Sequence, residues 1–123
     1  MRRRWRLWGH AATVEDVAAA RYFYQAVGWR PDPATGLLVD GDGRYLWIRP
    51  WDPEADPATA GGTPTAVRPG FLPVFLVADF DAVVDAWESQ GGRILGREPV
   101  AGRPAVLAQD REGARLFLMA EAD

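Results

Sequence analysis

Aromatic rings and guanidinium groups are concentrated in residues 42–51, which read DGRYLWIRPW. Side chains alternate along a strand, so Tyr45, Trp47 and Arg49 share one side and aliphatic residues take the other. The aliphatic side is suited to packing against a core. The other side offers stacking on a flat ring, together with polar contacts from arginine. The stretch therefore predicts a strand with one face suited to holding a small molecule.

The composition of the whole chain excludes several kinds of chemistry. The 123 residues contain no cysteine, which excludes disulfides, thiolate metal sites and a cysteine nucleophile, and His10 is the only histidine. The net charge of −3 argues against nucleic acid as a partner, and we interpret MRRRWR at residues 1–6 as a solvated start to a strand. With no apolar run after it, we expect neither a signal peptide nor a membrane anchor, and a cytoplasmic protein.

An internal repeat is the most informative pattern. HAATVEDVAAARYFYQAVGW, starting at His10, matches PVFLVADFDAVVDAWESQGG, starting at Pro73. Each copy predicts a short strand, an acidic cap and an amphipathic helix that ends at a glycine. In the first copy, Thr13 and Asp16 have the spacing of a capping box. The aligned pairs are Asp16 with Asp79, Tyr24 with Trp87 and Gly28 with Gly91.

The ends of the two copies also match. DGDGRYLWI (40–48) aligns with DREGARLFL (110–118), which places turn glycine Gly43 on Gly113. Two further strands fit between helix and final strand in each copy, so we predict an α+β fold with the order β-α-β-β-β repeated twice. We expect a single domain over residues 1–123, with the first module at about 5–50, a linker at 51–70 rich in Pro, Gly, Ala and Thr, and the second module at about 71–120.

These motifs resemble the glyoxalase/bleomycin resistance protein/dioxygenase superfamily, also called vicinal oxygen chelate proteins. The similarity rests on DVAAARYFYQAVGW (16–29) and QDREGARLFL (109–118), and it extends over nearly the whole chain. It implies two βαβββ modules whose strands form an open cup, usually in a homodimer with shared or swapped elements. Enzymes of this superfamily hold one divalent metal with four side chains, two from each module.

The resemblance places those four metal-ligand positions at His10, Trp47, Pro73 and Phe117. Of these four residues only His10 has a side-chain atom that can coordinate a metal ion. A metal site needs three or four converging N, O or S ligand atoms. We therefore expect no metal and no cofactor. For His10 three interpretations stay open: a hydrogen-bonded cup residue, a direct contact to a ligand, or a metal ligand.

Because side chains alternate along a strand, each of these positions predicts which other residues of its strand face the cup. An inward His10 would bring Trp8 with it, and Trp51 begins the segment that could cover the cup. The predicted ligand-binding residues are Trp8, His10, Tyr45, Trp47, Arg49, Trp51, Phe71, Phe75, Arg115, Phe117 and Met119. The alternative is that the aromatic residues simply fill a small barrel. Against this, Arg49 and Arg115 share the face, and guanidinium groups are seldom buried without partners.

The favoured function is a binding protein, not an enzyme. It would sequester a flat aromatic natural product or antibiotic in an aromatic-lined crevice and so give resistance, as the drug-binding branch of the superfamily does. The first alternative is an enzyme of the same superfamily, metal-dependent or not, with donors such as Glu98, Asp110 or Glu112. The second is a protein that binds a partner chain through its Trp-rich face.

Overall fold

The computed structural model describes residues 5–50 and 71–121. The chain divides into two compact units, which we call the first unit (residues 10–71) and the second unit (residues 1–9 and 72–123). Strand β1 (Trp5–Val14) contributes to both. Trp51 and the predicted linker at 51–70 lie outside the described residues.

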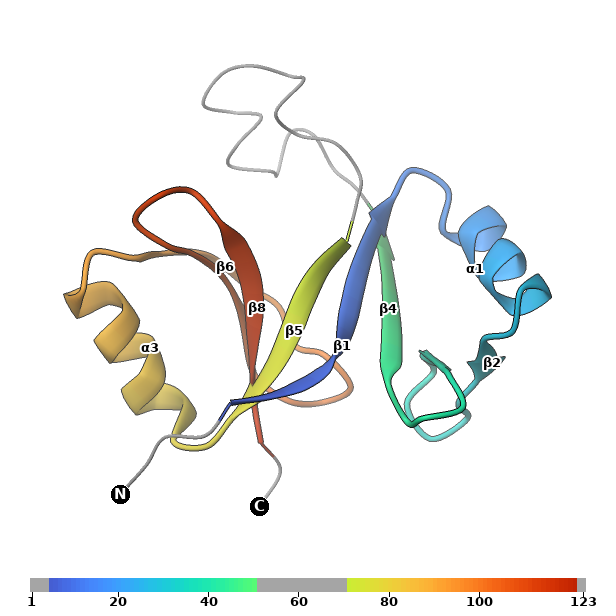
Figure 1. Cartoon of the computed structure of the whole chain (residues 1–123), viewed down its shortest axis with the longest axis horizontal. Coiled ribbons are helices and arrows are strands. Elements are labelled where there is room, and N and C mark those ends of the chain that lie inside the picture. The colour runs from blue at the N-terminus through green and yellow to red at the C-terminus, as the bar shows by residue number, and fades with distance from the viewer. Residues whose placement is uncertain (1–4, 51–70, 122–123) are drawn as a thin grey trace. The chain divides into compact units, whose positions relative to one another are not determined.

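The first unit contains the expected β-α-β-β-β order. Asp16 caps the helix, because its Oδ1 accepts a hydrogen bond of 2.9 Å from the backbone N–H of Ala19. The predicted capping box is wrong, since Thr13 is still part of β1. Figure 1 shows α1 beside β4. After β1, the elements of this unit are α1 (Val17–Ala26), β2 (Arg30–Pro31), β3 (Leu38–Val39) and β4 (Tyr45–Pro50).

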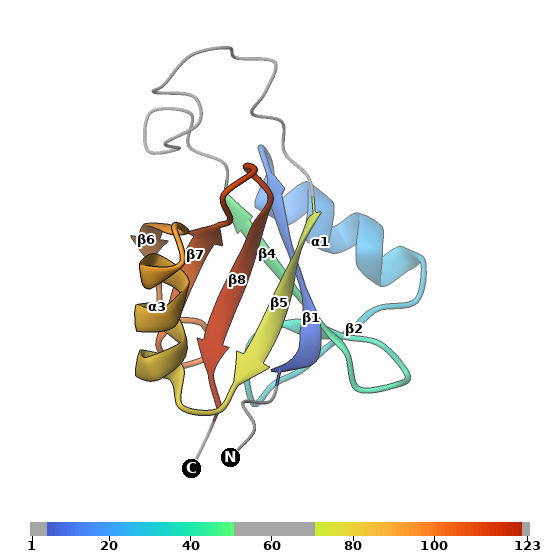
Figure 2. The ribbon, with the colours of Figure 1, turned by 60° about the vertical axis from the view of Figure 1, so that its left-hand side comes forward.

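The second unit repeats that order. Its central strands β5 and β8 are parallel. Strand β7 pairs antiparallel with β8 on one side and with β6 on the other. Helix α3 covers one face of these strands (Figure 2). Its N-cap residue, Asp79, has the left-handed φ of 53° and makes no side-chain cap bond. The elements are β5 (Phe71–Val77), α3 (Phe80–Ser89), β6 (Arg93–Arg97), β7 (Ala105–Gln109) and β8 (Arg115–Ala120).

Each helix encloses an apolar core against its own strands. The cluster beneath α1 is built on Ala12, Leu38, Leu46 and Ile48, with Val14, Val17, Ala20, Tyr24 and Trp29 packed around it. The cluster beneath α3 is built on Val77, Val83, Val84, Val106, Ala108 and Leu118, with Phe75, Phe80, Trp87, Ile94 and Leu116 around it. Burial of these side chains is the main source of stability in each unit.

The strand order confirms the predicted α+β repeat. It runs β2-β3-β4-β1 in the first unit and β5-β8-β7-β6 in the second. In each module the first strand therefore neighbours the last. Neither described helix is long and apolar enough to cross a membrane.

Candidate functional site

Two similar turns set the register of the strands that carry Trp47 and Phe117. Asp40 Oδ1 accepts hydrogen bonds from the backbone N–H groups of Asp42 and Arg44, at 2.8 and 2.9 Å. Asp110 Oδ1 does the same for Glu112 and Ala114, at 2.8 and 2.9 Å. The bond from the Arg44 N–H is the main cause that lowers the pKa of the Asp40 carboxyl group below its ordinary value.

The first unit confirms the predicted faces of β4. Leu46 pairs with Leu38, and both pack beneath α1, so Tyr45, Trp47 and Arg49 lie on the face away from α1. Arg49 is held there by two contacts. Its Nη1 donates a 3.1 Å hydrogen bond to Thr13 Oγ1, and its guanidinium carbon lies 5.4 Å from the centroid of the Trp47 ring. Trp47 is buried, whereas Tyr45 and Arg49 are half-buried.

The second unit has a comparable face away from α3. Phe117 pairs with Val74 and Leu107, whereas the neighbouring Leu118 packs beneath α3. At one end of this face, Arg115 Nε donates a 3.0 Å hydrogen bond to Gln109 Oε1. Phe117 is 1% exposed and Met119 0%, so these two are interior side chains, and their role in ligand binding stays a prediction. The residues on this face are Val74, Leu76, Ala105, Leu107, Gln109, Arg115, Phe117 and Met119.

The predicted face of Phe71 and Phe75 is wrong. Phe75 pairs with Leu118 and packs with it beneath α3, which is the opposite face from Phe117. Phe71 is exposed, and its ring lies 6.1 Å from that of Tyr24, a residue of α1 that packs on the cluster beneath this helix. On β5 it is Val74 and Leu76 that share the face of Phe117 and Met119.

The predicted direction of His10 is also wrong. Ala12, two residues along the strand, packs beneath α1, so alternation places His10 on that side as well. The His10 ring is exposed and lies 6.4 Å from the ring of Phe71. Trp8, by contrast, is buried at 8% exposure. His10 therefore does not share the face of Trp47.

The described residues do not fit the metal of the superfamily's enzymes. Trp47 and Phe117 occupy two of the four expected positions, and neither side chain is a metal donor. His10 lies on the helix side. Within residues 5–50 and 71–121, no three or more His, Cys, Asp and Glu residues are grouped so that they could hold an ion.

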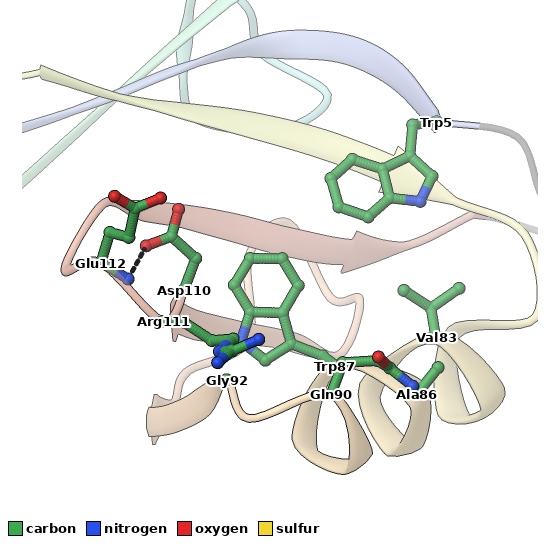
Figure 3. A pocket seen from close by; sticks show the side chains of 9 residues that line it. All are labelled: Trp5, Val83, Ala86, Trp87, Gln90, Gly92, Asp110, Arg111 and Glu112. Atoms are coloured by element: carbon green, nitrogen blue, oxygen red, sulfur yellow. Dashed lines mark hydrogen bonds between the residues drawn. The ribbon is translucent and has the colours of Figure 1, made fainter.

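A pocket that the sequence did not predict lies on the α3 side of the second unit (Figure 3). It has a volume of about 460 Å³. Trp5 and Trp87 form an aromatic wall, with ring centroids 6.3 Å apart and planes inclined by 28°. The sequence shows only that Trp87 aligns with Tyr24 in the repeat, and the position of Trp5 next to the arginine run is the one sequence signal for this site.

Comparisons with known proteins bear on the fold. No family model matches the sequence, and no curated protein matches it either. Among solved structures, a glyoxalase/bleomycin resistance protein/dioxygenase superfamily member from Vibrio splendidus 12B01 has a TM-score of 0.55 at 10% identity, covering 98% of this chain and all of the other (100%). A structure described as an NAD-dependent benzaldehyde dehydrogenase from Legionella pneumophila also has a TM-score of 0.55, at 16% identity, with coverage of 92% and 97%.

At these identities the likeness concerns architecture alone. Taken with the repeated β-α-β-β-β order, it shows that the chain has the fold of the glyoxalase/bleomycin resistance protein/dioxygenase superfamily.

Proposed function

We propose that this protein binds a flat aromatic small molecule without transforming it, and so sequesters an antibiotic-like compound. One observation carries the proposal. On β4 the residue four positions after the turn glycine is Trp47, where the resemblance expects a metal ligand, and it lies away from α1 beside a guanidinium group. A ring and a cation on one face favour stacking and polar contact over metal chemistry.

The accessible groups suggest the ligand's character. Tyr45 and Arg49 are half-buried, so each keeps solvent-facing surface that a ligand could contact. The Arg49 guanidinium group favours a neutral or acidic polycyclic compound, such as a quinone-type natural product, over a cationic one.

Tryptophan fluorescence of the purified protein tests the proposal against a panel of flat aromatic antibiotics. At least one compound should quench the emission at micromolar concentration. Trp47→Leu should weaken its binding by about 2- to 12-fold, the range that one aromatic contact is worth. Trp29→Leu is the matched control, because Trp29 packs beneath α1 on the opposite face of the same unit, and it should leave affinity unchanged.

Two results would overturn the proposal. The first is the absence of quenching by every compound in the panel. The second is a stoichiometric divalent ion in the purified protein together with turnover of a bound compound, which would favour an enzyme of this fold. Metal analysis and product analysis on the same preparation distinguish these cases.

We also propose a homodimer, as the superfamily resemblance implies. Helix α1 and its C-cap carry exposed apolar side chains, with Tyr22 at 79%, Phe23 at 58% and the C-cap residue Val27 at 63% exposure. Light scattering should give a solution mass of two chains, and the double variant Tyr22→Ser, Phe23→Ser should give one. A monomeric native protein would contradict the proposal.

A further inference from the structure

The pocket lined by Trp5 and Trp87 lies apart from the faces discussed above. Trp87 and Val83 pack into the cluster beneath α3, so the pocket is on the opposite side of the second unit's strands from Phe117. Its volume of about 460 Å³ falls within the range of small-molecule sites. We propose that it is a second binding site, for a small organic cation such as a quaternary or alkyl ammonium group.

The aromatic wall is built before any ligand arrives. The indole N–H of Trp87 donates a 3.0 Å hydrogen bond to the backbone carbonyl of Gln109, which fixes the plane of the ring. A Cβ at Gly92 would lie 2.3 Å from Trp87 Nε1, so the ring edge rests directly on the backbone there. Trp5 also contacts the ring of Phe75, with ring centroids 5.4 Å apart. A rigid wall reduces the ordering that binding would require.

The charges at the rim select a cation. Figure 3 shows the carboxylates of Asp110 and Glu112 near one end of the aromatic wall. They outnumber the one guanidinium group, that of Arg111, whose methylene stem lies against Gly91. No salt bridge neutralises Glu112 or Arg111 through another described residue. Indole faces are themselves attractive to cations, and tryptophan is the strongest of the aromatic side chains in this respect.

Choline and its neutral isostere 3,3-dimethylbutan-1-ol have nearly the same shape, so together they test charge recognition. Titrations followed by tryptophan fluorescence and by calorimetry should show choline binding at least about 3-fold more tightly, as cation–π attraction predicts. Trp5→Leu should abolish the preference. Trp5→Phe keeps an aromatic ring and controls for misfolding, and it should retain part of the preference for choline. Trp47→Leu should have no effect, which separates this site from the proposed aromatic-ligand site.

Two substitutions in the exposed turn give the sharpest test, because they predict opposite signs. Glu112→Gln should weaken choline binding by about 2- to 5-fold, and Arg111→Gln should strengthen it by a similar factor. Equal binding of the neutral isostere would overturn the proposal. So would the reverse signs, with Arg111→Gln weakening binding, since an anion would then be the preferred ligand. Absence of binding by choline up to millimolar concentrations would overturn it too.

Discussion

Replacing Phe117 by alanine is expected to lower the free energy of unfolding by about 3–5 kcal/mol. Phe117 is 1% exposed and lies at the centre of β8, where it is flanked by Val74 and Leu107 on neighbouring strands. The substitution leaves a cavity that these strands can close only in part. Because a domain of this size is stable by only about 5–15 kcal/mol, the variant should unfold at much lower denaturant concentration.

Urea unfolding followed by circular dichroism measures this loss. Phe117→Leu is the matched control, since it keeps most of the apolar volume and should cost less than about 1.5 kcal/mol. If alanine and leucine at this position proved equally mild, the interior packing of Phe117 would contribute little to the stability of the second unit.

The faces of β4 and β8 could be predicted because a turn anchors each strand. The Asp-x-x-Gly turns place Gly43 and Gly113 at a fixed distance before Trp47 and Phe117. Hydrogen bonds that the Asp40 and Asp110 carboxylates accept from backbone N–H groups hold that geometry. Once one residue is placed, alternation assigns the others. The prediction therefore succeeded wherever a local interaction sets the register.

The faces of Phe75 and His10 were wrong because no such anchor precedes them. Each lies on a strand that leads into a helix through a connection whose backbone the sequence does not determine, and Asp79 takes a left-handed conformation in the second connection. A slip of one residue reverses every side chain of a strand. Both faces of β5 are apolar, so composition offered no means of detecting the error.

The Trp5–Trp87 pocket could not be predicted because it depends on tertiary packing. Its two rings come from β1 and α3, elements that are far apart in the sequence. The repeat aligns Trp87 with Tyr24, and nothing in that alignment indicates a pocket. Only the packing of Trp5 onto Trp87, with Gly92 beneath, produces a wall.

Gly92→Ala is expected to be the most damaging change at this pocket. Its Cβ would lie 2.3–2.9 Å from three atoms of the Trp87 indole, so the ring or the backbone must move. Movement of the ring breaks its hydrogen bond to the Gln109 carbonyl and disturbs the stack with Trp5. We expect a loss of about 1–3 kcal/mol in unfolding free energy, the usual cost of overpacking. The tryptophan emission should also change.

Gly96→Ala is the matched control for this prediction. It lies on β6 in the same unit, and a Cβ there meets nothing within 4 Å, so its stability should change by less than about 1 kcal/mol. Gly92→Ala should in addition weaken choline binding, whereas Gly96→Ala should not. If Gly92→Ala left both stability and emission unchanged, Trp87 would have room to move, and the wall would not be rigid enough to form a cation site in advance of binding.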